Sequence, residues 1–156
     1  MSGPEPQRTK FEKIILQQFQ NYNEKAVIVL GNIKENETYF LNENVVVKSH
    51  VFSKELNDII NKSEVVISRS GYSSIMDFVV LQKKALLIPT PGQSEQEYLA
   101  EYLKSKGVFY SVEQKKLNIK NQLPKLNDLK EIRNRKSSDF IDMESLFKRI
   151  FADHFG

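Results

Sequence analysis

The chain has 156 residues, the length of one ordinary domain, and its hydrophobic content of 40% can fill a core. It contains no cysteine and only two histidines, His50 and His154, which argues against disulfides, cysteine nucleophiles and a metal site built from thiolates or imidazoles. The net charge of +3 is densest over residues 115–136, where interspersed Asn, Asp and Glu favour a solvated face over a nucleic-acid or membrane patch. We therefore expect no nucleic-acid partner and no metal.

No apolar run approaches the roughly 20 residues of a membrane span. The polar N-terminus also lacks the apolar core of a signal peptide. These two features predict a cytoplasmic protein.

Short apolar runs alternate with amphipathic segments through most of the chain. Such runs are typical of strands that are covered on both faces, as in parallel sheets, and amphipathic segments predict helices. The strands expected on this basis are 26–30, 45–47, 65–67, 85–88 and 108–110. The helices expected are 11–21, one capped by Ser53, 73–82, 94–106 closed by Gly107, 123–134 and 139–155. This alternation predicts one α/β domain over residues 1–156 with a doubly wound, Rossmann-like parallel sheet of about five strands.

The first predicted element is a helix, although a strand–helix–strand unit begins with a strand. Met1-Ser2-Gly3 would then be the end of a strand that lies mostly upstream in a longer natural chain. We therefore expect a fragment whose first strand is truncated. The resulting gap in the sheet would be closed by strand rearrangement or by a dimer of the fragment.

The stretch Ser63–Glu97 contains the best candidate for a ligand site. It predicts a strand, a glycine turn, a helix, a second strand and a proline–glycine loop that opens a further helix. The two strand ends, near 69–74 and 89–97, would lie on the carboxyl edge, where open parallel sheets bind ligands. At the first of them, Gly71 permits a sharp turn before a helix start whose free N–H groups can bind an anion. The alternative is that Ser73 only caps this helix.

Other polar residues near these strand ends also have a structural and a functional interpretation. Asp77 could interact favourably with the helix dipole, or it could accept hydrogen bonds from a ribose diol. The polar run 93–97 suits sugar hydroxyls, but it is also typical of an exposed first turn. His50 lies on the same edge, whereas His154 suits a solvated terminal position.

Several common nucleotide and hydrolase motifs are absent. No GxGxxG follows a strand, and no GxxxxGK[ST] is present, so dinucleotide-binding and P-loop interpretations fail. No Ser/His/Asp arrangement has a usable context.

Four segments carry a combined pattern: Ser63–Gly71, Ser73–Asp77, Ala85–Pro89 and Gln96. Together they resemble the C-terminal domain of GT-B glycosyltransferases, in particular the family that contains the bacterial N-acetylglucosaminyltransferase of peptidoglycan-precursor synthesis. The family pattern is R-[SA]-G-x-x-[ST]-[IV]-x-E, then a strand that ends in proline and a Gln-rich helix start. The resemblance covers about 45–107 well and the first helix loosely.

The resemblance implies that the full-length protein is an inverting, metal-independent hexosyltransferase. It would use a UDP-sugar such as UDP-GlcNAc, need no cofactor, and glycosylate a lipid-linked or glycan acceptor. The nucleotide-sugar-binding residues implied are Phe52, Ser53, Ser70, Gly71, Ser73, Ser74, Asp77, Gln96 and Glu97.

Each of these residues has an implied role. Gly71, Ser73 and Ser74 match the turn and helix start near the diphosphate. Asp77 matches a ribose-binding acid that is usually Glu. The segment of Phe52 and Ser53 matches the one whose backbone contacts uracil. Gln96 matches the first of two glutamines that contact the hexose.

The chain departs from the family pattern at three places. Glu97 stands where the second hexose-binding glutamine would be, and Ala100 stands where an asparagine is usual. Pro4 follows Ser2-Gly3, unlike the usual glycine-rich phosphate loop. These departures leave the identity of the sugar open.

In that family the acceptor site and the catalytic base belong largely to an N-terminal domain. We therefore expect this chain alone to bind nucleotide weakly and to transfer no sugar, and we assign no catalytic residue in it. A lipid-linked acceptor implies peripheral contact with the inner face of the membrane. Two alternatives stay open: a non-catalytic nucleotide-sugar-binding subunit that works with a separate membrane-anchored partner, and a nucleotide-sugar epimerase of the same architecture.

Overall fold

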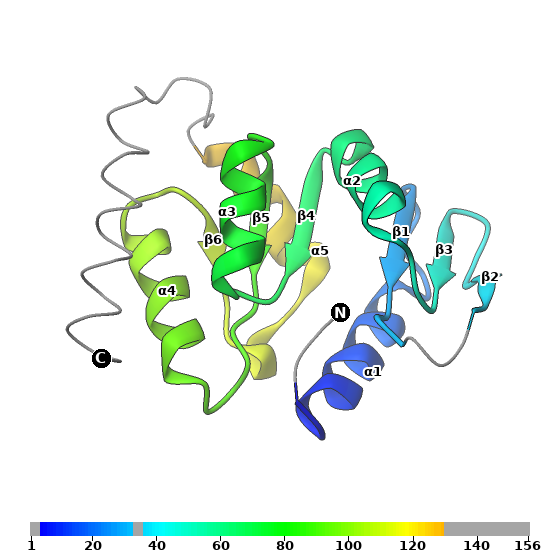
Figure 1. Cartoon of the computed structure of the whole chain (residues 1–156), viewed down its shortest axis with the longest axis horizontal. Helices are drawn as coiled ribbons and strands as arrows, with labels where there is room; N and C mark the ends of the chain where they lie inside the picture. The colour runs from blue at the N-terminus through cyan, green and yellow to red at the C-terminus, as the bar shows by residue number, and fades with distance from the viewer. Residues whose placement is uncertain (1–3, 33–35, 130–156) are drawn as a thin grey trace.

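A computed structural model describes residues 4–32 and 36–129, in which helices and strands alternate (Figure 1). The helices are α1 Gln7–Phe19, α2 Ser53–Lys62, α3 Tyr72–Val80, α4 Ser94–Ser105 and α5 Ile119–Gln122. The strands are β1 Ala26–Val29, β2 Thr38–Phe40, β3 Val45–Lys48, β4 Val65–Ser68, β5 Lys84–Leu87 and β6 Tyr110–Ser111. Two 3-10 helices, η1 Gln114–Lys116 and η2 Leu123–Asp128, flank α5.

The strands form two three-stranded sheets instead of one continuous sheet. The first has the order β1-β3-β2, with β1 parallel and β2 antiparallel to β3. The second has the order β4-β5-β6 and is parallel throughout. In Figure 1 the edge strands β1 and β4 are the neighbours across the division between the sheets. The α/β class is confirmed, and the two sheets divide between β1 and β4.

Both faces of the β4-β5-β6 sheet are covered. Successive side chains of residues 85–88, in β5 and directly after it, point to opposite faces and pack into two different clusters. Ala85 and Leu87 pack with the apolar residues of α3 and α4. Leu86 and Ile88 pack on the other side with α1 and with the turns that follow β6. All four are fully buried, as expected for the central strand of a parallel sheet.

Helix α1 joins the two sheets through a shared core. Its buried residues Phe11, Ile15 and Phe19 belong to one cluster with Val45 of β3 and Leu86 of β5. Since β3 and β5 lie in different sheets, α1 packs across the division between them.

Most helices and strands lie within a few residues of their predicted positions, and Gly107 has the positive φ of 63° that suits the end of α4. Three segments differ. β2 was not predicted, since its residues are exposed and show no apolar alternation. The strand expected at 108–110 is reduced to Tyr110–Ser111 because the N–H of Val108 donates to Leu103 O at the end of α4.

The segment after β6 is less regular than predicted. The helix expected at 123–134 begins as the 3-10 helix η2, with Pro124 in its first turn. The end of that prediction and the helix expected at 139–155 lie outside the described residues.

Arg69, which directly follows β4, links four segments in the interior. Its Nη1 donates to the carbonyl oxygens of Ile88 and Pro89, both at 3.2 Å. Its Nη2 donates to Gln7 O at 3.2 Å and to Gln114 Oε1 at 2.7 Å. One side chain therefore fixes the start of α1, the end of β4, the loop after β5 and the turn after β6.

Arg69 is only 3% exposed, and its guanidinium pairs with no carboxylate in the described part of the chain. Burial lowers its pKa to about 10, which leaves it charged at neutral pH. The ring of Phe11 lies 4.0 Å from its central carbon, so a cation–π contact compensates part of the lost hydration.

The two valines at the end of α3 provide a matched test of the core. Val79→Ala should lower the free energy of unfolding by about 2 kcal/mol, because Val79 is 8% exposed and the change removes two packed methyl groups. Val80→Ala is the control, since Val80 is 74% exposed. Urea denaturation measures both, and equal losses would contradict the packing of α3.

Arg69→Met should lower the free energy of unfolding by about 1–3 kcal/mol, because buried carbonyl oxygens lose their donors. Arg69→Lys should restore only part of the loss, since a single ammonium cannot reach all four acceptors. The control is Arg8→Met, which removes an exposed ion pair with Glu5 and should matter much less. Thermal denaturation monitored by circular dichroism compares the three, and full recovery with lysine would refute the linking role.

Candidate functional site

The loops that follow β4 and β5 are hydrogen-bonded to each other at the carboxyl edge of their sheet. Ser70, which is fully buried, donates from its Oγ to the backbone oxygen of Gln96 at 2.8 Å. This bond brings the start of α3 next to the start of α4, which is the arrangement that the sequence predicts for 69–74 and 89–97.

Gly71 occupies the N-cap position of α3, with φ −69° and ψ 144°. This is extended backbone that any residue can adopt, so the turn has no conformational requirement for glycine at this position. A Cβ built on Gly71 would meet no described atom within 4 Å. The space in front of the helix start is therefore open on this side.

Ser73 does not cap α3. The helix begins at Tyr72, and no side chain makes a capping hydrogen bond at its N-terminus. The N–H groups of Ser73 and Ser74 in the first turn can therefore donate to an outside acceptor, as helix starts do with anions. Ser73 is exposed and Ser74 is half-buried, so both hydroxyls lie close to this end.

Asp77 lies in the second turn of α3, since the first turn contains no acidic residue. The dipole interaction expected for a first-turn acid is therefore weak here. Asp77 is exposed, and four residues before it Ser73 lies on the same exposed face of the helix. This face presents a carboxylate and a hydroxyl side by side.

Gln96 and Glu97 brace the loop that precedes α4. Gln96 accepts a hydrogen bond from Thr90 N at 3.0 Å and donates to Gln93 Oε1 at 2.6 Å. Glu97 accepts one from Gly92 N at 3.0 Å. A sugar contact at either side chain would have to share or replace these bonds. Ala100, the departure from the pattern, is buried in the core.

Phe52 and Ser53 lie at the start of α2, after the strand β3 of the other sheet. Phe52 is at the N-cap position and is 77% exposed, and its ring meets that of His50 edge-on at 5.3 Å. Ser53 is the first helical residue and not the predicted cap. Within the described ranges no hydrogen bond connects these residues to the loops after β4 and β5.

Two interior polar groups at this edge were missed at the level of sequence. Arg69 has a buried Nε without a hydrogen-bond partner among the described residues. The buried Oγ1 of Thr90 also has no hydrogen-bond partner there. An arginine placed directly between an apolar strand and a Ser-Gly pair was the available signal for the first. Nothing in the sequence distinguishes Thr90.

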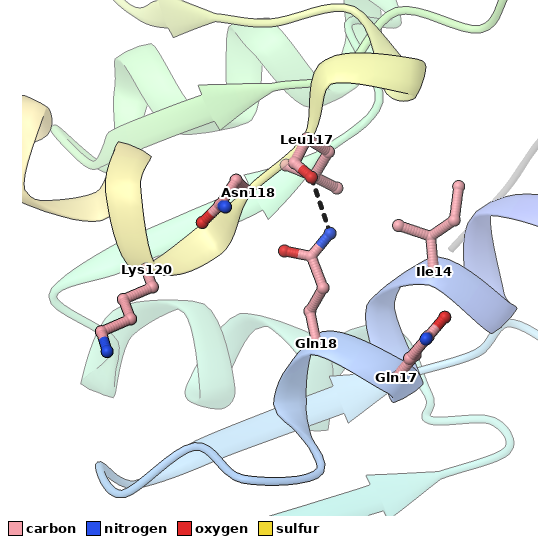
Figure 2. A pocket seen from close by; sticks show the side chains of 6 residues that line it. All are labelled: Ile14, Gln17, Gln18, Leu117, Asn118 and Lys120. Carbon is pink, nitrogen blue, oxygen red and sulfur yellow. Dashed lines mark hydrogen bonds between the residues drawn. The ribbon is translucent and has the colours of Figure 1, made fainter.

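A separate hollow of about 460 Å³ opens between α1 and the segment after η1 (Figure 2). Gln18 spans it, since its Nε2 donates to Leu117 O at 2.7 Å and its Oε1 accepts from Ile119 N at 2.7 Å. The remaining lining residues are Ile14, Gln17, Asn118 and Lys120. None of the predicted site residues lines this hollow, so it is distinct from the candidate site.

The described residues were also compared with the requirements for a membrane span and for a metal site. None of them has the length and apolar character that a membrane-spanning helix requires. Residues 4–32 and 36–129 contain no group of three or more His, Cys, Asp or Glu side chains arranged to hold a metal ion.

Relatives with known names are transferases of one kind. The chain is 34% identical over 112 residues to the UDP-N-acetylglucosamine--N-acetylmuramyl-(pentapeptide) pyrophosphoryl-undecaprenol N-acetylglucosamine transferase of Sulfurihydrogenibium sp., covering 69% of the chain and 28% of that protein. It is 29% identical over 127 residues to the transferase of the same name from Staphylococcus aureus, covering 72% of the chain and 36% of that protein. The chain thus spans about a third of the length of these relatives.

Solved structures with a similar fold include a spinosyn forosaminyltransferase, with a TM-score of 0.56 at 18% identity over 74% of this chain and 28% of that chain. Another is the glycotransferase of kitacinnamycin, with a TM-score of 0.60 at 15% identity over 83% of this chain and 32% of that chain. At these identities the likeness concerns the fold alone, and both neighbours are GT-B glycosyltransferases. The profile of the glycosyltransferase family 28 C-terminal domain matches residues 6–153. The chain therefore belongs to the family of glycosyltransferase family 28 C-terminal domains.

Proposed function

We propose that this chain is the donor-binding domain of an inverting glycosyltransferase that uses a UDP-sugar and needs no metal ion. The observation that carries the proposal is the Ser70–Gln96 hydrogen bond, which holds an uncapped helix start beside a second polar loop on the carboxyl edge. The names of the relatives, which transfer N-acetylglucosamine from its UDP form, support a UDP-hexose as donor.

The start of α3 would hold the diphosphate. The N–H groups and the hydroxyls of Ser73 and Ser74 are donors, and the helix dipole offsets negative charge in place of a metal ion. Because these donors are already in position, they stabilise charge that develops on the leaving diphosphate. The open space over Gly71 gives the phosphates access to the backbone.

Asp77 would accept hydrogen bonds from the two hydroxyls of the ribose, one turn further along α3. The backbone of Phe52 and Ser53 would contact the uracil, which places the nucleotide across both sheets. Gln96 would contact the hexose while it keeps its bond to Thr90 N, since a carbonyl oxygen has two lone pairs.

The reaction would be a single displacement. An acceptor hydroxyl attacks the anomeric carbon, the bond from that carbon to the diphosphate oxygen breaks, and the diphosphate leaves with the electron pair. The acceptor's proton goes to a base outside this chain, which we place in an N-terminal domain together with the acceptor site. A lipid-linked acceptor would bring the full protein to the inner membrane surface, and this chain alone would transfer no sugar.

A second candidate is a non-catalytic subunit that binds the nucleotide sugar and works with a separate membrane-anchored partner. An acceptor domain encoded in the same reading frame supports the first candidate, and a separate gene product that restores transfer supports the second.

The role of Asp77 predicts a specific pattern of nucleotide affinities. Asp77→Asn should weaken binding of UDP by about 10-fold or more, because a charged hydrogen bond to the ribose is lost. The loss should be smaller for 2′-deoxy-UDP, because this nucleotide keeps only one of the two hydroxyls that Asp77 would bind. Asp128→Asn makes the same change in charge at an exposed position away from α3. Calorimetric titration measures these affinities, and an equal loss for both nucleotides would refute the ribose contact.

Gly71→Ala separates a binding role from a structural one. It should leave the free energy of unfolding unchanged or raise it slightly, since Gly71 has a negative φ and a Cβ there meets no described atom within 4 Å. It should nevertheless weaken UDP, because the added methyl group occupies the approach to the helix start. Denaturation and titration of the same preparation test this. Unchanged affinity for UDP would place the diphosphate elsewhere.

A further inference from the structure

We propose that Glu97 makes the donor site select an uncharged hexose and reject a hexuronic acid, whose ring carries a carboxylate. The inference rests on the proposed function, because it concerns the sugar of the same UDP-linked donor. Its basis is the position and the charge of one side chain in the first turn of α4.

Glu97 lies close to the start of α3. The Oγ of Ser70 donates to Gln96 O at 2.8 Å. Glu97 directly follows Gln96 in the chain, and the residue directly after Ser70 is the N-cap of α3. Side chains on a helix lean toward its N-terminus, so that of Glu97 leans toward the carboxyl edge of the sheet. Because the hexose of a UDP-sugar is attached directly to the diphosphate, a diphosphate at the start of α3 would place the hexose beside Glu97.

The protein's own backbone holds the carboxylate of Glu97 at this edge, while one of its oxygens stays available. Oε1 accepts a hydrogen bond from Gly92 N at 3.0 Å. In residues 4–32 and 36–129, Oε2 makes no hydrogen bond and no ion pair, and the residue is exposed. A carboxylate oxygen accepts hydrogen bonds and donates none, so this group can bind a sugar hydroxyl.

No basic side chain of the two loops is available to offset this charge. Residues 89–97 contain no lysine and no arginine, and Glu95 adds a second acidic residue to the same helical turn. In the loop after β4 the basic residue is Arg69, which is 3% exposed and donates to oxygens of the protein. The second loop therefore presents acceptors and negative charge to the hexose.

Charge would decide between two classes of sugar at this place. A neutral hexose offers hydroxyls that can donate to Glu97. A hexuronic acid brings a second negative charge close to the first, where like charges repel and no cation of the two loops compensates. The alternative is that Glu95 and Glu97 only interact favourably with the dipole of α4, as first-turn acids do, and have no effect on the choice of sugar.

Calorimetric titration of the full chain with UDP, UDP-glucose and UDP-glucuronate tests the inference. The two sugars differ in one group, a hydroxymethyl in glucose and a carboxylate in glucuronate. We expect UDP-glucose to bind about 10-fold more tightly than UDP-glucuronate or better. Glu97→Gln should reduce this ratio to about 3-fold or less, because it removes the charge while a glutamine oxygen can still accept from Gly92 N. The ratio is the quantity to compare, since the lost charge also acts on the diphosphate that all three ligands share.

Glu43→Gln is the matched control. It makes the same change at an exposed residue between β2 and β3 of the other sheet, and it should leave the ratio as it is in the unmodified chain. Equal affinities for the two UDP-sugars would overturn the inference, and so would a ratio that Glu97→Gln leaves unchanged. Either result would leave the proposed donor site standing as long as UDP binds. Absence of UDP binding would contradict the proposed function itself, and this inference with it.

Discussion

The carboxyl edge of the β4-β5-β6 sheet depends on one buried guanidinium group, that of Arg69. Its donors reach the start of α1, the loop after β5 and the turn after β6, and the group is only 3% exposed. Because its acceptors are neutral carbonyl and amide oxygens, the charge is dispersed over several segments and not neutralised by one carboxylate. Small shifts of any of these segments would leave a charged donor buried without an acceptor, which is costly. Arg69 thus keeps the loops of the candidate site in fixed relative positions without contacting the proposed ligand.

The polar residues at this edge fall into two groups, one that makes hydrogen bonds within the protein and one that is available to a ligand. Ser70, Gln96 and Glu97 are engaged with the protein's own backbone. Ser73 and Asp77, by contrast, lie on an exposed face of α3 whose first turn has no side-chain cap. A nucleotide diphosphate needs donors for its phosphates and acceptors for its ribose, and α3 offers both within two turns. The proposed specificity for the sugar rests on Gln96 and Glu97, whose side chains already make hydrogen bonds within the protein.

Local patterns predicted the elements that local interactions determine. The unbroken apolar run of β5 and the amphipathic α4 lie close to where their sequences indicate. β2 could not be predicted, since its exposed residues are extended only because they pair with β3. The contacts of Arg69 were also inaccessible, because its acceptors Gln7 and Gln114 lie 62 and 45 residues away in the sequence. Gly71 was expected to permit a sharp turn, and its backbone is extended in a way that any residue can adopt.

NMR mapping of UDP binding on the isotope-labelled chain would test the central claim, that α3 begins a diphosphate site, most directly. The account predicts that the largest amide shifts fall on residues 71–77, with a smaller effect at Gln96. Shifts concentrated around Gln18 and Leu117, at the hollow beside α1, would contradict it and would place nucleotide binding on a different surface.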